Sequence, residues 1–205
     1  NILDILAKTG AQKVNIIAHS MGGLDARHMM FNDRDTGKIH ERIASLTTIS
    51  TPHAGSPFAD WGLNNLSQLP FLLKKAGLDV DAFQDLRTES CKAFNGRPEI
   101  IDFELRCETN TIFQTYAGRQ KYWGIFNLLK GPSRIIEEKE GENDGMVSVQ
   151  SAKWRDEYFK GTLDETDHLN ELGWWDVPQL MKGETPDELL QRIHEFYASV
   201  ARDLP

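Results

Sequence analysis

The sequence contains no apolar run that approaches the ~20 residues needed to span a bilayer, so a transmembrane helix is not expected. It is also short of positive charge, because 23 Lys and Arg stand against 31 Asp and Glu, a net charge of -8. That balance argues against nucleic acid or an anionic membrane as an electrostatic partner, but not against a neutral lipid surface. Cysteine is scarce: Cys91 and Cys107 could pair or remain free, and they do not settle the redox compartment.

Internal repeats, low-complexity linkers and a visible signal peptide are absent as well. With 205 residues, of which 40% are hydrophobic, a single domain over residues 1–205 is expected. The chain does not begin with Met, which indicates a processed chain or a fragment of a longer protein. The compartment and the oligomeric state stay open.

The most informative segment is Val14-Asn-Ile-Ile-Ala-His-Ser-Met-Gly-Gly23. A short β-branched run is followed by a small-x-Ser-x-Gly turn and then by a helix-like stretch, which is the form of a nucleophile elbow. Ala18 and Gly22 supply the small residues on either side of Ser20. The elbow exposes the Ser20 hydroxyl at the sheet edge and aims the Met21 backbone N–H at the same point, where it could stabilise an oxyanion.

A serine hydroxyl is a weak nucleophile, so the chain must also supply a histidine base and a carboxylate that orients it. The order expected for an elbow serine is Ser, then Asp or Glu, then His. Asp144 lies in the turn sequence Asn143-Asp-Gly145, and His168 lies in a polar loop after the strand-like segment 158–163. We therefore predict Ser20, Asp144 and His168 as the catalytic residues and Met21 as an oxyanion donor.

Several other histidines and acidic residues are candidates for the same roles. His19 adjoins Ser20, but neighbouring side chains of an elbow diverge, so it is expected to be structural. His53 follows a strand near the predicted site, and we favour a turn histidine that caps backbone groups. Asp164 and Asp167 could replace Asp144 as the acid, although triad members normally arrive on different loops. The remaining histidines are expected to be ordinary surface or half-buried residues: His28, His40 and His194.

Helices alternate with short apolar strands along the chain, which predicts an α/β class with a mostly parallel sheet. Strands are expected over 13–18, 43–50 and 112–117, with a final amphipathic helix over 186–201 capped by Thr185. A helical insertion at about 57–95 interrupts the alternation and contains many large apolar residues. It is either an ordinary cover over the sheet or a lid or acyl-binding wall. Residues 119–140 are expected to form a surface excursion with a solvated charge run.

Four segments together resemble the lipases of the α/β-hydrolase fold, namely the bacterial true lipases and the fungal triacylglycerol lipases. They are Ala-His-Ser-Met-Gly-Gly at 18–23, Thr-Pro-His-Ala-Gly-Ser at 51–56, Asn-Asp-Gly-Met-Val at 143–147 and Asp-His-Leu-Asn at 167–170. The resemblance implies a long-chain carboxylic ester as substrate, no cofactor, and the same three residues: Ser20, Asp144 and His168.

Two departures accompany the resemblance. The family's other oxyanion donor lies on a loop upstream of the elbow, so the chain is expected to be the C-terminal portion of the fold, with N-terminal strands missing. Bacterial relatives also carry a carboxylate of a calcium site two residues after the catalytic histidine. Asn170 occupies that position here. An amide contributes no charge to a cation site, so no metal is expected.

These observations favour a triacylglycerol lipase that acts through an acyl-enzyme. Whether it acts at a lipid–water interface stays open. The alternatives are another lipid ester or thioester hydrolase or acyltransferase, such as a phospholipase, and a non-catalytic α/β-hydrolase scaffold. The natural lipid stays open.

Overall fold

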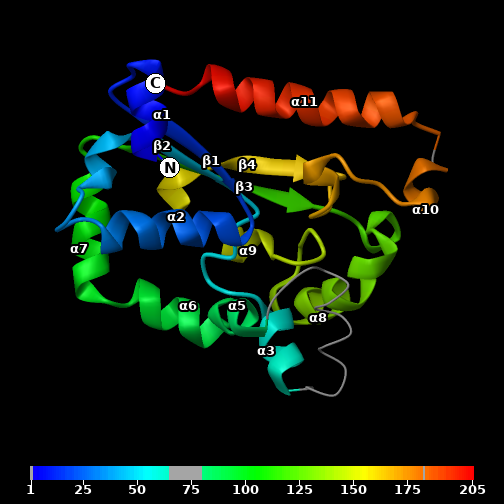
Figure 1. Cartoon of the computed structure of the whole chain (residues 1–205). Coiled ribbons are helices and arrows are strands. Elements are labelled where there is room, and N and C mark those ends of the chain that lie inside the picture. Colours follow the sequence, from blue (N-terminus) through cyan, green and yellow to red (C-terminus); the bar gives the residue numbers. More distant parts are fainter. Residues whose placement is uncertain (1, 65–79, 182) are drawn as a thin grey trace.

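A computed structural model describes residues 2–64, 80–181 and 183–205 of the chain. Its centre is a sheet of four parallel strands in sequential order (Figure 1). The strands are β1 (Val14–His19), β2 (Ile43–Ile49), β3 (Ile112–Arg119) and β4 (Phe159–Asp164). Because all four run the same way, their carboxyl ends meet at one edge, where loops can converge. The predicted parallel α/β architecture is confirmed.

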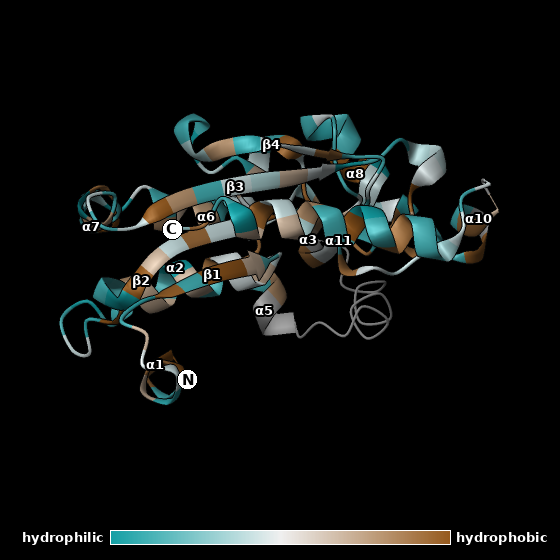
Figure 2. Ribbon diagram, turned by 90° about the horizontal axis from the view of Figure 1, so that it is seen from above, coloured by the Kyte–Doolittle hydropathy of each residue, from teal (hydrophilic) through white to brown (hydrophobic). Residues whose placement is uncertain are grey.

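Helices cover both faces of the sheet, as expected for parallel strands whose faces are apolar. The connections between consecutive strands place their helices on one face, and α11 lies on the other, where Phe196 contacts Tyr116 of β3 (Figure 1). Seen from above, α11 runs along the strands, while α1 and α10 lie at opposite ends of the molecule (Figure 2). The helices are α1 (Ile2–Thr9), α2 (Met21–Asn32), α3 (Pro57–Asn64), α5 (Val80–Asp85), α6 (Thr88–Asn95), α7 (Pro98–Cys107), α8 (Lys130–Glu140), α9 (Val149–Ala152), α10 (Val177–Leu180) and α11 (Pro186–Arg202).

Short 3₁₀ turns join several of these elements: η1 (Ile39–Arg42), η2 (Tyr122–Gly124), η3 (Asn127–Leu129), η4 (Asp156–Tyr158) and η5 (Asn170–Leu172). The last helix begins as predicted, since Thr185 and Glu188 form a reciprocal capping box with Pro186 in the first turn. No helix in the described part of the chain is both long enough and apolar enough to cross a membrane.

The apolar interior consists of two main clusters. The first lies between the sheet and the helices α2 and α7, and includes Met30, Leu46 and Phe113. The second lies under α3, α5, α6 and α8, and includes Leu24, Phe58 and Phe83. The second cluster borders the elbow serine, because Met21 packs against it.

Residues 119–140 differ from the expected surface excursion. Lys130–Glu140 is the helix α8, and its Ile136 is fully buried in the second cluster, beneath α3. The charge run is exposed at Glu137, Glu138 and Lys139, as predicted. The apolar residues before it are too few to show the helical period clearly, and tertiary packing decides their structure.

The predicted insertion at 57–95 is helical at both ends, in α3 and in α5 with α6. Its middle, residues 65–79, lies outside the described residues, so the lid remains a prediction. Cys91 and Cys107 are free, and burial raises the pKa of each thiol to about 11. Both thiols are therefore protonated and unreactive at neutral pH.

Candidate active site

Ser20 lies at the tip of the turn between β1 and α2, in a backbone conformation that few residues other than glycine adopt. Its φ is 54° and its ψ is -134°. Neighbouring groups hold this strained conformation: the Ser20 N–H donates to the Ile49 carbonyl at 2.9 Å, and the Thr51 hydroxyl donates to the Ser20 carbonyl at 2.7 Å. Met21 is the first residue of α2, so its N–H belongs to the amides that have no acceptor within the helix.

Gly23 is the residue that the elbow needs to be small. A Cβ at Gly23 would lie 2.2 Å from the Thr51 hydroxyl and 2.9 Å from the Thr48 methyl. A Cβ at Gly22 would meet only the Ala18 Cβ, at an ordinary 3.9 Å. The sequence motif emphasises Gly22, whereas close packing of α2 against the end of β2 restricts Gly23.

Gly23→Ala is therefore expected to lower the free energy of unfolding by about 1–3 kcal/mol, because overpacking moves α2 and the elbow. Gly22→Ala serves as the matched control and should be neutral or slightly stabilising, since alanine is the better helix former. Urea unfolding followed by circular dichroism measures both. Equal effects of the two substitutions would contradict the packing seen at Gly23.

Asp144 is fully buried in the loop that precedes α9. One carboxylate oxygen accepts from the backbone N–H groups of Met146 and Val147, at 2.8 and 2.7 Å. The other lies 2.7 Å from Nδ1 of His168. Burial alone would raise the pKa of Asp144, but the charge and hydrogen bond of His168 and the two amides hold it below its usual value. Asp144 is thus an ionised, rigidly oriented acceptor.

His168 brings the predicted residues together. Its Nε2 lies 2.9 Å from the Ser20 hydroxyl oxygen, and its Nδ1 faces Asp144. The backbone N–H of His168 donates to the Asp144 carbonyl at 2.9 Å, which ties the two loops to each other. Burial tends to lower the pKa of His168, but the Asp144 carboxylate raises it to about 9. The three side chains form one continuous chain of hydrogen bonds from hydroxyl to carboxylate.

The two other candidate acids have different partners. Asp164 pairs with Arg119 at the surface. Asp167 is buried and accepts hydrogen bonds from the N–H groups of Leu169, Asn170 and Phe126. Burial raises the pKa of Asp167 to about 6 in spite of these hydrogen bonds. Asp167 therefore fixes the shape of the loop that carries His168. The carboxylate that contacts the His168 ring is that of Asp144.

Sequence reasoning missed Glu171, whose side chain is fully buried beside His168. It lies 2.7 Å from Nε2 of His19 and accepts from the Ser50 hydroxyl at 2.6 Å. The His19 ring lies 4.5 Å from the His168 ring, so Glu171 fixes a second ring against it. Gly118 leaves the space for Glu171, because a Cβ there would lie 2.0 Å from its carboxylate. The sequence signal for Glu171 is that it follows His168 by three residues, which places the two residues in the same turn of the chain.

His53 does not cap backbone groups with its ring, contrary to the prediction. Its Nε2 contacts the Thr48 hydroxyl at 2.9 Å, its Nδ1 contacts the buried guanidinium of Arg27 at 3.2 Å, and its ring stacks on Trp154. Burial, with the Arg27 charge, lowers the pKa of His53 well below its usual value. Arg27 is in turn paired with Glu104 at 2.8 Å. His53 is thus a neutral structural residue in a buried polar network. The prediction was wrong because Arg27 and Trp154 are distant in sequence, so the residues around His53 give no sign of them.

Asn170, the residue in the calcium position of bacterial relatives, uses its amide within the loop. Its oxygen accepts from the Asp167 N–H at 3.1 Å, and its nitrogen donates to the Trp174 carbonyl at 2.8 Å. A third partner is the amide of Gln179. The loop is therefore braced by side-chain amides.

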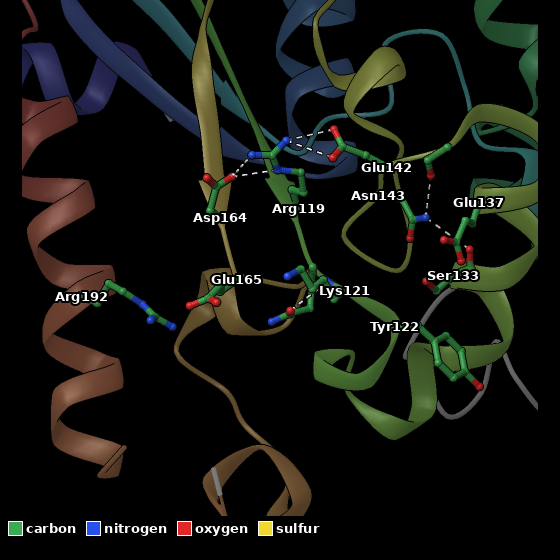
Figure 3. A pocket seen from close by; sticks show the side chains of 12 residues that line it. Arg119, Lys121, Tyr122, Ser133, Glu137, Glu142, Asn143, Asp164, Glu165 and Arg192 are labelled. Carbon is green, nitrogen blue, oxygen red and sulfur yellow. Dashed lines mark hydrogen bonds and ion pairs between the residues drawn. The ribbon is translucent and has the colours of Figure 1, made fainter. Parts of the chain in front are cut away.

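A separate pocket of about 850 Å³ lies near the carboxyl ends of β3 and β4 (Figure 3). Arg119 lies between Asp164 and Glu142 there, and Lys121, Glu165 and Arg192 add further charge. Neither Ser20 nor His168 lines it. The apolar side chains near the serine belong instead to the second cluster, against which Met21 and Met146 pack.

An elbow serine on a parallel sheet, with a histidine on the loop after β4, is the arrangement of the α/β-hydrolase fold. The model of the PGAP1-like alpha/beta domain matches residues 1–70. The chain is 31% identical over 98% of its length to triacylglycerol lipase 2 of Saccharomyces cerevisiae, and spans 59% of that protein. Over 60 residues, 29% of the chain and 15% of the relative, it is 47% identical to a triacylglycerol lipase of Burkholderia plantarii.

Solved structures agree on the fold. The metagenomic carboxyl esterase MGS0156 superimposes with a TM-score of 0.66 at 18% identity, covering 98% of this chain and 60% of the esterase. The mature Bacillus licheniformis lipase BlEst2 superimposes with a TM-score of 0.61 at 24% identity, covering 82% of this chain and 62% of the lipase. The chain is thus similar to lipases and esterases of the α/β-hydrolase fold, and it spans about three-fifths of the yeast relative.

Proposed function

We propose that this chain carries the catalytic residues of a carboxylic-ester hydrolase that cleaves long-chain triacylglycerols. The observation that carries the proposal is the position of His168, whose two ring nitrogens lie 2.9 Å from the Ser20 hydroxyl and 2.7 Å from the Asp144 carboxylate. That is the arrangement required for activation of a serine nucleophile.

In the proposed reaction the Ser20 oxygen attacks the ester carbonyl while its proton passes to Nε2 of His168. Asp144 accepts the Nδ1–H hydrogen bond, which fixes the tautomer and stabilises the imidazolium. His168 then gives the proton to the departing alkoxide, which leaves as the free alcohol, and Ser20 remains acylated. Water attacks the acyl-enzyme with His168 again as the base, and the fatty acid is released as Ser20 regains its proton.

Met21 is the proposed oxyanion donor. Its N–H directly follows the nucleophile at the start of α2, where the helix dipole also favours negative charge. The Met21 side chain belongs to the apolar cluster with Phe58 and Met146, so apolar surface begins next to the reacting group. This supports an acyl chain as the part of the substrate that binds there, in line with the lipase names of the relatives.

A series of p-nitrophenyl esters from acetate to palmitate, hydrolysed by the full-length protein, tests the substrate class. We expect kcat/KM to rise with acyl length, because each buried CH₂ contributes about 0.8 kcal/mol. A preference for short esters would favour a general esterase. Hydrolysis of phospholipid or thioester in preference to triolein would favour the phospholipase or thioesterase alternative, and no turnover of any ester would favour the non-catalytic scaffold.

The pH dependence of hydrolysis provides a separate test. His168 must be neutral to accept the serine proton, and its pKa is raised to about 9. Below that pH the neutral fraction grows as pH rises, so kcat/KM for a soluble short ester should increase from pH 6 towards pH 9 and then level off. Initial rates at constant ionic strength measure the profile. A profile already flat between pH 6 and 8 would contradict the strong coupling of His168 to Asp144.

A further inference from the structure

Two neighbouring surface segments beside the proposed active site expose large apolar side chains. Among the residues that the structure describes, four large apolar residues stand out with 62–80% of their surface accessible: Trp123, Trp174, Val177 and Met181. All four lie in residues 122–127 and 170–181. We call these four residues the apolar rim.

Hydrogen bonds hold the two segments side by side. The Gln179 side chain donates to the Gly124 carbonyl at 2.7 Å, and the Asn127 N–H donates to Asp176 at 2.7 Å. In Figure 1, α10 and the chain just before α8 lie on the same side of the molecule. The backbone beneath the rim is therefore fixed by the buried side chain of Gln179 and the half-buried side chain of Asp176.

The same hydrogen bonds connect the rim to the loop of His168. The Trp174 N–H donates to the Leu169 carbonyl at 3.1 Å, and Asp167 accepts from both Phe126 and Gln179. A surface that meets the rim thus meets the segment next to the proposed base. A substrate held at the surface of a lipid phase that contacts the rim would therefore lie close to the loop of His168.

The chemistry of the rim identifies its partner. Neither rim segment contains Lys or Arg, and the net charge of the chain is -8, so an anionic membrane would repel it. Tryptophan prefers the boundary between lipid and water, where its ring is buried and its N–H remains hydrated. We propose that the apolar rim binds the surface of uncharged lipid, such as a triacylglycerol droplet, and so brings the active site to the substrate. The proposal rests on the proposed lipase function.

The test measures binding without turnover. The parent is the full-length protein with Ser20→Ala, and the probe is a triolein emulsion stabilised with phosphatidylcholine, separated by flotation. Trp123→Ser with Trp174→Ser should weaken binding about tenfold or more, because binding scales with the apolar area buried. Val177→Ser with Met181→Ser is a second variant with the same expectation. The matched control is Ile101→Ser with Leu105→Ser on α7, which removes two exposed apolar residues outside the rim.

Several outcomes would overturn the proposal. They are equal binding by the rim variants and the parent, equal losses in the rim and α7 variants, and absence of parent binding to the emulsion. A dimer in sedimentation that the rim variants abolish would assign the rim to a second copy of the chain. Hydrolysis of p-nitrophenyl acetate by the Ser20-containing rim variants should stay within about twofold of wild type, since they leave the Ser20 site intact. Failure of wild type to hydrolyse any ester would instead refute the proposed function, whatever the binding result.

Discussion

Ser20→Ala is expected to lower kcat for ester hydrolysis on the order of 10⁶-fold, to the level that binding and oxyanion stabilisation alone provide. The Ser20 hydroxyl is the group that His168 contacts at 2.9 Å, and alanine removes it without changing the hydrogen bonds of the backbone N–H and carbonyl that hold the elbow. Initial rates with p-nitrophenyl butyrate measure the loss.

The matched control is Ser199→Ala on α11, where the hydroxyl only donates to the Phe196 carbonyl within its own helix. That variant should keep wild-type activity. Both proteins should unfold at similar urea concentrations, because neither substitution changes the apolar core. Activity of the Ser20 variant within tenfold of wild type would refute the assignment of the nucleophile.

Asp144→Asn should lower kcat about 10⁴-fold, because an amide that donates to His168 Nδ1 favours the wrong tautomer. The same substitution should move the inflection of the residual pH profile to lower pH. The Asp144 charge raises the pKa of His168 against the effect of burial, and without that charge burial dominates. The pH–rate profile of the variant, compared with wild type, measures both effects.

Asp164→Asn is the control for this prediction, since Asp164 pairs with Arg119 at the surface and contacts none of the three residues. It should leave kcat and the inflection unchanged. An unaffected Asp144→Asn variant beside an inactive Asp164→Asn variant would show that the acid was misassigned. Glu171 lies close enough to contribute negative charge to His168, so a residual rate above that of Ser20→Ala is compatible with the proposal.

Local sequence predicted the elements whose signals are local. The strand before Ser20, the helix after it and the cap at Thr185 all depend on residues within a few positions, and the structure contains them. The loops of Asp144 and His168 could also be found, because Asn143-Asp-Gly145 is a turn sequence and His168 directly follows a strand-like segment.

The remaining features depend on contacts between distant segments. Gly23 is restricted by Thr51, His53 is held by Arg27 and Trp154, and Glu171 meets His19 from the other end of the chain. Each contact joins residues from elements that the fold brings together, so the residue's own neighbours carry no signal of it. The helix α8 was missed for the same reason, since Ile136 is buried by α3 and its cluster.

The most direct test of the central claim is covalent labelling with a fluorophosphonate, followed by intact-mass measurement and peptide mapping. We expect one adduct per protein, located on Ser20, and labelling at least about 10³-fold slower in His168→Ala, because the hydroxyl then lacks its base. A folded wild-type protein that takes up no label, or takes it up at another residue, would contradict the claim that Ser20, His168 and Asp144 form a catalytic site.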